Sequence, residues 1–416
     1  MNLRKDADQI IRESIRSVLP DEAVKRVLEG ESFKSFLPEE GKLYLVAVGK
    51  AAWQMAYTAV SILENKLEQG IVLTKYGHCK GEISRTKCLE GGHPVPDQNS
   101  YRGTDAILQM TSGLTEQDRI LFLLSGGGSA LFEKPLVSEE VMENVTKQLL
   151  SCGADITEIN TIRKRLSGVK GGRFGKHCEP AKIFSIVLSD VLGDSLDMIA
   201  SGPAAADNTT CEEAVAIVER YHLDFDESVC ILLSKETPKE LSNVATVVSG
   251  SVRALCEAAK RECELLGYET LVLTDRMDCE AREAGAFLAS IARTYENTKK
   301  DLAFIAGGET VVHLKGTGKG GRNQELALSA AIKLANISNA AIFSIGSDGT
   351  DGPTDAAGGY VDGDTLQRLK KAQVDIYKEL DNNNAYYALE QCGGLIKTGP
   401  TGTNVNDVAV ALLRHK

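Results

Sequence analysis

The sequence lacks the features of a disulfide framework, a zinc site or a membrane anchor. Its ten cysteines are scattered, with no C-x-x-C pair and no Cys/His cluster at zinc spacing. Reduced thiols therefore fit this chain better than disulfide bonds do. Residues 1–8 lack the apolar core of a signal peptide, and no apolar run approaches membrane-spanning length. These absences predict a cytoplasmic protein that binds no membrane.

Positive charge is also in deficit. The chain has 47 Lys and Arg against 58 Asp and Glu, a net charge of −11. Non-specific binding to nucleic acid or to an acidic membrane needs a basic surface, so the net charge argues against both partners. An acidic protein that binds a small anionic substrate must gather positive charge in a cleft. The sequence leaves the oligomeric state open, and a homo-oligomer is possible.

No internal repeat or low-complexity segment interrupts a regular alternation of strands and helices. A chain of 416 residues is too long for one hydrophobic core, so we expect two domains, residues 1–240 and 241–416. The alternation predicts two α/β domains with a mainly parallel sheet and a cleft between them. The expected strands of the first domain are residues 43–48, 71–74, 120–124 and 183–188. Those of the second are residues 246–249, 270–274, 302–306, 310–314 and 340–345.

Two glycine-rich loops follow expected strands. Ser125, Gly126, Gly127, Gly128 and Ser129 come directly after residues 120–124. Backbone N–H groups in such a loop can cradle an anion, although a tight turn is the simpler alternative. The loop is not a nucleophile elbow, because Leu131 stands where that motif needs glycine.

The second loop, Gly316-Thr-Gly-Lys-Gly-Gly321, formally matches G-x-G-x-x-G. No acidic residue follows about 20 positions later, which disfavours NAD, and Gly320 after Lys319 excludes a P-loop. What remains is a loop whose Lys319 and Arg322 suit nucleotide phosphates. A flexible surface hairpin is the alternative.

Acidic residues gather in Gly346-Ser-Asp-Gly-Thr-Asp-Gly-Pro-Thr-Asp355, directly after an apolar strand. Asp348, Asp351 and Asp355 repel one another unless a cation relieves them, although Asp and Gly also dominate ordinary turns. The segment is not an EF-hand, because Thr350 and Pro353 occupy positions that need an acid or amide and a glycine.

Single charged residues stand at other strand ends. Lys50 lies between a strand and its helix, where the helix dipole disfavours a cation unless it faces an anion. Asp190 and Glu309 end two further strands, and acids there can bind Mg²⁺ or accept a hydroxyl proton. A helix cap or a salt bridge explains either one equally well. The basic segment 160–173 is expected mostly to form a solvated helix face.

Together these motifs resemble the class II glycerate kinases with a C-terminal MOFRL-type domain. The first half carries Val48-Gly-Lys-Ala-Ala52, Gly91-Gly-His-Pro-Val-Pro96, Leu124-Ser-Gly-Gly-Gly-Ser129, Asn160-Thr-Ile-Arg-Lys164, Leu188-Ser-Asp-Val-Leu-Gly-Asp194 and Ala200-Ser-Gly-Pro203. The second half carries Gly307-Gly-Glu-Thr310, Gly320-Gly-Arg-Asn-Gln-Glu-Leu-Ala-Leu328, the aspartate loop and Thr398-Gly-Pro-Thr-Gly-Thr-Asn-Val405. The resemblance spans nearly the whole chain.

The resemblance implies a Rossmann-like first domain, with ATP, Mg²⁺ and glycerate meeting in the cleft. It implies site roles for Lys50, Asp190, Glu309, Arg322, Asp348 and Asn404. Chemically, Lys50 and Arg322 suit the transferred phosphoryl group, and Asp348 with either Glu309 or Asp190 suits the metal. Asp190 is expected to orient the glycerate hydroxyl. The choice of the 2-hydroxyl follows from the resemblance alone. The rival functions are a hydroxypyruvate or tartronate oxidoreductase and a non-catalytic sensor of sugar acids or nucleotides.

Overall fold

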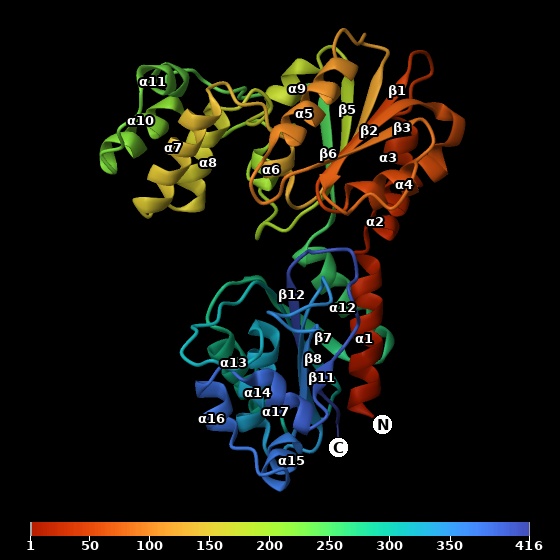
Figure 1. The fold of residues 1–416 in the computed structure, drawn as a ribbon. Helices are drawn as coiled ribbons and strands as arrows, with labels where there is room; N and C mark the ends of the chain where they lie inside the picture. The colour runs from red at the N-terminus through yellow and green to blue at the C-terminus, as the bar shows by residue number, and fades with distance from the viewer. Residues whose placement is uncertain (1, 416) are drawn as a thin grey trace. The chain divides into compact units, whose positions relative to one another are not determined.

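The computed structural model describes residues 2–415, which form two compact units (Figure 1). The central unit is Ala23–Ser249. The split unit combines Met1–Glu22 with Gly250–Lys416. Each unit contains one six-stranded sheet.

The sheet of the central unit has the order β3-β2-β1-β4-β5-β6. β1 pairs in parallel with β2 and β4, β2 with β3, and β4 with β5. The carboxyl ends of these five strands therefore share one edge of the sheet, where open α/β sheets bind ligands. The strands are β1 (Leu43–Val48), β2 (Leu67–Lys75), β3 (Thr86–Gly91), β4 (Arg119–Leu124), β5 (Lys182–Leu188) and β6 (Val244–Gly250).

Both faces of this sheet are covered, which explains why its strands read as continuous apolar runs. Leu43, Leu45 and Ala47 of β1 enter one core, while Val46 and Val48 enter the other. α2 (Pro20–Leu28) runs from the last residues of the split unit's first segment into the central unit. Further helices of the central unit are α3 (Glu31–Lys34), α4 (Ala52–Leu63), α5 (Gln98–Met110), α6 (Gly128–Leu131) and α9 (Arg173–His177), with 3₁₀ turns η1 (Glu64–Lys66) and η2 (Ile199–Ser201).

Four further helices of the central unit pack on one another around a separate apolar core. They are α7 (Glu139–Ser151), α8 (Ile156–Arg165), α10 (Cys211–Arg220) and α11 (Glu227–Leu233). Figure 1 draws them as one group. Val145, Ile162, Ile217 and Val229 contribute one buried side chain from each helix. The unit is thus a parallel α/β sheet with a group of helices from two segments, one between β4 and β5 and the other between β5 and β6.

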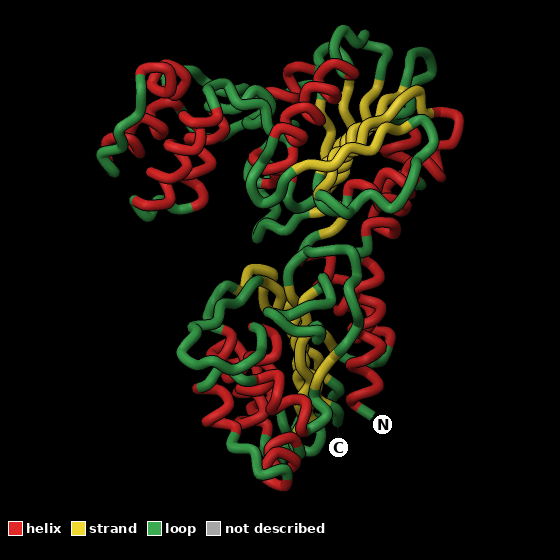
Figure 2. Tube along the Cα trace, viewed as in Figure 1, coloured by secondary structure: helices red, strands yellow, loops and turns green. Residues whose placement is uncertain are grey.

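The sheet of the split unit is mixed, with the order β11-β10-β9-β12-β8-β7. Figure 2 draws the strands of both units in yellow. β12 is antiparallel to both β8 and β9, β10 is antiparallel to β9 and β11, and only β7 with β8 pairs in parallel. The mainly parallel sheet expected for the first domain is therefore confirmed in the central unit, and the sheet of the split unit is mixed. The strands are β7 (Glu269–Met277), β8 (Leu302–Gly308), β9 (Ala340–Gly346), β10 (Gly358–Asp362), β11 (Leu395–Ile396) and β12 (Asp407–Leu413).

Helices cover both faces of this second sheet. One core contains side chains of α1 (Leu3–Ser17) and α12 (Val252–Leu265), and the other contains those of α13 (Ala281–Thr294) and α14 (Arg322–Leu334). Three short helices, α15 (Thr365–Lys371), α16 (Ile376–Asp381) and α17 (Ala385–Gln391), add to the second core.

The compact units divide the chain between Ser249 and Gly250, and the N-terminal helix belongs to the second of them. α1 belongs to the split unit because Ile10 and Ile11 pack in the core that also contains Phe343 of β9. Asp6 of the same helix accepts hydrogen bonds from Tyr268 Oη at 2.7 Å and Arg414 Nη2 at 2.9 Å. Residues 241–249 remain with the central unit, where β6 forms its edge strand.

The prediction of a strand at residues 310–314 is wrong. This segment is irregular apart from one isolated bridge between Val311 and Glu280. Val311 is 48% exposed and Leu314 is 82% exposed, and only Val312 between them packs against the core of the split unit. Within residues 2–415, no helix combines the length and the hydropathy needed to cross a bilayer. All ten cysteines are free.

Candidate functional site

Lys50 lies in the turn from β1 to α4, and this turn is bonded to the first glycine loop. The Lys50 N–H donates to Gly126 O at 2.9 Å, and the Ala51 N–H donates to Ser125 Oγ at 3.1 Å. Gly49 has a φ of +119°, and a side chain there would overlap Ser125. The backbone of Lys50 is therefore fixed, while its side chain is exposed.

The loop Ser125–Ser129 sits at the carboxyl edge of the sheet. Gly127 has a φ of +86°, and a Cβ there would lie 3.0 Å from His93 Cδ2 and 3.2 Å from Lys50 Cγ. A Cβ on Gly126 would overlap the Asp190 carboxylate. The structure thus brings Lys50, His93 and Asp190 around the glycine loop, each from a different strand end.

The backbone of this loop has unused donors. Among residues 2–415, none accepts a hydrogen bond from the N–H groups of Gly126, Gly127 or Gly128. Backbone donors of this kind seek an acceptor, and an anion supplies one. The arrangement favours the anion cradle over the simple turn.

A chain of side-chain hydrogen bonds holds the end of the Ser125–Ser129 loop in place. Ser129 Oγ lies 2.9 Å from Ser201 Oγ, which donates to Asn160 Oδ1 at 3.1 Å. Ala200 and Ser201 have φ of +51° and +61°, a conformation that costs free energy for residues with side chains. Such strain persists only where surrounding contacts hold it, and these hydrogen bonds do so at the glycine loop.

The basic segment 160–173 does not form the solvated helix face that was expected. Lys164, Arg165 and Lys170 are fully buried. Lys164 Nζ lies 3.0 Å from both Asp197 and Asp207, and Lys170 pairs with Glu133. The expectation failed because the matching carboxylates lie up to 43 positions away in the sequence.

In the split unit, Arg322 begins α14 and is held by two acids. Its Nε donates to Asp407 Oδ2 at 2.6 Å and its Nη2 to Asp407 Oδ1 at 3.1 Å. Its Nη1 donates to Glu309 Oε1 at 2.8 Å. Although burial opposes it, the bond to Asp407 raises the pKa of the Arg322 guanidinium. Arg322 is thus a fixed, permanently charged cation.

Asp348 follows β9 and lies close to the same group. A Cβ on Gly346 would lie 3.2 Å from Asp348 Oδ1 and 3.4 Å from Asp407 Oδ1. Asp348 Oδ1 accepts the Thr350 N–H at 2.9 Å. Asn404 precedes β12 and is exposed, with Oδ1 3.2 Å from the Asn406 nitrogen. Asp348 and Asp407 therefore both lie beside Gly346, and Asp407 is the one bound to Arg322.

The other two acids of the aspartate loop have structural roles. Asp351 is 3% exposed and accepts the N–H groups of Asn323 at 3.2 Å and Gln324 at 2.9 Å, which caps α14. Asp355 pairs with Lys397 Nζ at 2.9 Å and accepts from Tyr386 Oη at 2.7 Å. Of the three acids, only Asp348 remains available for a metal ion.

The second glycine loop is anchored rather than flexible. The N–H groups of Lys315 and Gly316 donate to Asn383 Oδ1, and that of Lys319 donates to Asn384 Oδ1 at 3.0 Å. Lys319 Nζ lies 4.5 Å from the centre of the Tyr386 ring. Because asparagine side chains already occupy these N–H groups, the backbone of this loop is a poor phosphate cradle. The Lys319 side chain remains exposed.

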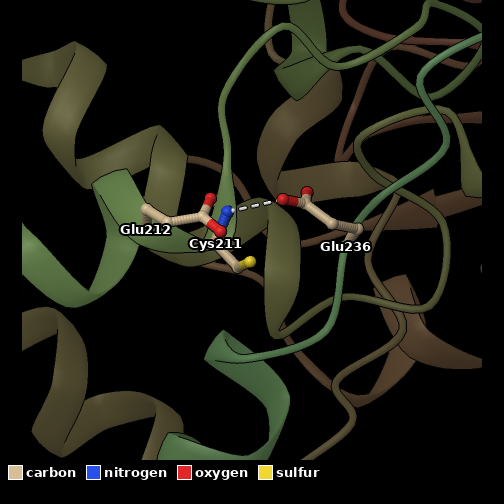
Figure 3. A group of neighbouring side chains, drawn as sticks. All are labelled: Cys211, Glu212 and Glu236. Carbon is tan, nitrogen blue, oxygen red and sulfur yellow. Dashed lines mark hydrogen bonds between the residues drawn. The ribbon is translucent and has the colours of Figure 1, made fainter.

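Cys211, Glu212 and Glu236 lie close enough to share a metal ion, with ligand atoms within 4.8 Å (Figure 3). Glu236 is already used, because it accepts the Cys211 N–H at 2.8 Å and pairs with Lys239 at 2.7 Å. The hydrogen bond to Glu236 raises the pKa of the Cys211 thiol, and a protonated thiol is a poor ligand. This group caps α10 and has no property of a catalytic centre.

The sequence-predicted residues thus form two groups. Lys50, the Ser125–Ser129 loop and Asp190 lie in the central unit, and Arg322, Glu309, Asp348, Lys319 and Asn404 lie in the split unit. Sequence reasoning gave no role to His93 or Asp407. His93 belongs to the motif Gly91-Gly-His-Pro-Val-Pro96. Asp407 is the first residue of the last apolar strand, and its charge at a strand end could have identified it as a candidate site residue.

Comparisons with known proteins agree along the whole chain. Residues 6–234 match the family described as "Domain of unknown function (DUF4147)", and residues 302–407 match the MOFRL family. The D-glycerate 2-kinase of Thermotoga maritima is 50% identical, with 99% of each chain covered. A putative hydroxypyruvate reductase of Agrobacterium vitis is 38% identical, with 91% of this chain and 89% of that protein covered. The crystal structure of a Thermotoga maritima glycerate kinase superposes with a TM-score of 0.93, at 50% identity and 99% coverage of both chains.

Proposed function

The chain belongs to the glycerate 2-kinase family, and on that premise we propose that it transfers the γ-phosphoryl group of ATP to the 2-hydroxyl of D-glycerate. The main support for this proposal is the set of groups around the glycine loop Ser125–Ser129. There, three N–H groups without acceptors, the cation Lys50 and the carboxylate Asp190 meet at the carboxyl edge of a parallel sheet.

Phosphoryl transfer requires few covalent steps from the protein, so positioning and charge carry most of the catalysis. We assign Lys50 and the N–H groups of the Ser125–Ser129 loop to anionic oxygens, whose charge they offset. We assign Asp190 to the glycerate hydroxyl, because it adjoins Gly126 and can accept that proton. In the split unit, Arg322 faces phosphate oxygens, with Lys319 and Asn404 as further nucleotide contacts.

Mg²⁺ fits the acids of the split unit. Magnesium binds one or two carboxylates together with phosphate oxygens and water. Asp348, beside Gly346, is a carboxylate that no ion pair within residues 2–415 occupies, whereas both oxygens of Asp407 bond to Arg322. When bound, the ion would offset the negative charge of the phosphate oxygens. Asp348 is the principal ligand in this proposal. Glu309 is a second ligand only if its bond to Arg322 is exchanged for the metal.

A hydroxypyruvate oxidoreductase is the competing function, since one relative bears that name. The loop that formally matches a dinucleotide motif argues against it. Its N–H groups donate to Asn383 and Asn384, whereas a pyrophosphate site needs such groups free. The described residues thus provide no dinucleotide cradle in this loop.

The experiment is an assay of two reactions with one preparation. ADP formation from ATP and Mg²⁺ is measured with and without D-glycerate, and NADH oxidation is measured with hydroxypyruvate. We expect ADP formation that depends on glycerate, and NADH oxidation no faster than a blank without enzyme. NADH oxidation in the absence of glycerate-dependent ADP formation would refute the kinase.

A further inference from the structure

His93 lies in a tightly built loop between β3 and α5. Gly91 and Gly92 precede it, and a Cβ on Gly91 would lie 2.6 Å from Ser100 Oγ. The Gly92 N–H donates to both Asp97 Oδ1 and Ser100 Oγ at 3.0 Å. These bonds tie the loop to the first turn of α5, so the position of His93 is set by the backbone.

The imidazole adjoins the first glycine loop on the side of Lys50. A Cβ on Gly127 would lie 3.0 Å from His93 Cδ2, 3.1 Å from His93 Nε2 and 3.2 Å from Lys50 Cγ. Within residues 2–415, no residue forms a hydrogen bond with the His93 ring. A partly buried ring with no partner, beside free backbone donors, is placed to bind a ligand.

The charges around His93 favour its neutral form. Burial lowers the pKa of the imidazole, and Lys50, Lys75 and His78 lower it further. Lys75 ends β2, and His78 Nδ1 lies 2.9 Å from Lys50 O. A neutral imidazole has one N–H to donate. The neutral His93 ring thus offers one N–H for a hydrogen bond in a region where Lys50 and Lys75 already supply positive charge.

The order of residues along the glycine loop matches the order of groups in a 2-hydroxy acid. Gly126 adjoins Asp190, and the next residue, Gly127, adjoins Lys50 and His93. In a 2-hydroxy acid, the hydroxyl and the carboxylate stand on adjacent carbon atoms. A hydroxyl at Asp190 can therefore place the carboxylate at Gly127, where the positive charge of Lys50 favours the carboxylate over the neutral hydroxymethyl group.

We propose that His93 donates a hydrogen bond to the carboxylate of the acceptor substrate and so selects acids over neutral polyols. This inference rests on the proposed function, because it takes glycerate as the acceptor. A phosphate oxygen of the nucleotide is the other anion that such a donor could bind. The position of Asp190 favours the carboxylate.

The test compares His93→Ala and His93→Gln with the wild-type enzyme. Glutamine retains an N–H donor near the place of Nε2. Loss of a hydrogen bond to a charged group corresponds to about tenfold or more in affinity. We expect His93→Ala to raise the KM for glycerate by about that factor, with the KM for ATP changed less than about twofold. His93→Gln should restore most of the difference.

His177→Ala is the matched control, because His177 is an exposed histidine of the same unit in α9. We expect its kinetic constants to equal those of the wild type. A rise in the KM for ATP alone would assign His93 to phosphate and overturn the proposal, as would an unchanged KM for glycerate. A wild-type enzyme without glycerate-dependent ADP formation would instead refute the function itself. The two failures are therefore distinguishable.

Discussion

Arg322 and Asp407 form a two-pronged ion pair, with Nε to Oδ2 at 2.6 Å and Nη2 to Oδ1 at 3.1 Å. The first residue of α14 is thereby bound to the first residue of β12, where Asp407 is only 2% exposed. Paired bonds between guanidinium and carboxylate fix orientation as well as charge. Arg322 is therefore held in one direction before any ligand binds, which is the preorganisation that phosphoryl transfer needs.

Lys50→Ala is expected to lower kcat by about 10²–10³, the usual cost of losing one charge contact in the transition state. Folding should remain intact, since the loop contacts of Lys50 come from its backbone. Steady-state kinetics and circular dichroism measure the two effects. Lys42→Ala is the control, because Lys42 is exposed just before the opposite end of β1. A near-wild-type kcat for Lys50→Ala would remove Lys50 from the site.

Asp348→Asn is expected to lower the rate and to raise the Mg²⁺ concentration needed for half-maximal activity. The reason is the loss of one charged ligand from a site that offers few. A Mg²⁺ titration at saturating ATP measures the shift. Asp355→Asn is the matched control in the same loop, since Asp355 is committed to Lys397 and Tyr386. Equal titrations for wild type and Asp348→Asn would contradict the metal assignment.

Much of the fold follows from local patterns. The apolar runs at residues 43–48, 120–124 and 183–188 are strands because both faces of the parallel sheet are buried. Residues 310–314 are also rich in apolar side chains, but within the described part of the chain they pair with other residues through one isolated bridge only. The strand predicted from their apolar pattern is therefore absent. The place of α1 depends on contacts with residues more than 240 positions away, which no local pattern records.

The candidate site was partly predictable for the same reason. Charged residues and glycines at strand ends identified Lys50, the Ser125–Ser129 loop and Asp190, and the parallel sheet brings them together. The aspartate loop was harder, because Asp348, Asp351 and Asp355 look equivalent in the sequence. Their separation into a metal candidate, a helix cap and a surface ion pair depends on tertiary contacts.

Lys164→Met is expected to destabilise the protein by about 3–5 kcal/mol, the usual cost of breaking a buried ion pair from one side. Lys164 is fully buried, and its removal leaves Asp197 and Asp207 without their shared cation. Urea unfolding measures the change. Lys176→Met should have little effect, because the Lys176 pair with Glu179 is exposed. Equal stability of the two variants would show that the buried network contributes nothing.

Asp351→Asn should change how stability depends on pH. Burial raises the pKa of Asp351 from 3.8 to about 7, against the N–H donors of Gln324 and Asn323. A raised folded-state pKa means that the contribution to stability is fully present below pH ~4 and lost as the pH rises through about 7. The free energy of unfolding of wild type relative to Asp351→Asn should thus fall between pH ~5 and ~7 and level off above pH ~8. A difference that stays constant with pH would contradict the buried, protonated cap.

The position of the phosphoryl group in the product is the most direct test of whether the protein phosphorylates the 2-hydroxyl of D-glycerate. After reaction of D-glycerate with ATP and Mg²⁺, phosphorus–proton correlation NMR of the product identifies the carbon that bears the phosphate. We expect 2-phosphoglycerate, with the phosphorus coupled to the single proton on C2. A product coupled to the two protons on C3, or no phosphorylated product at all, would contradict it.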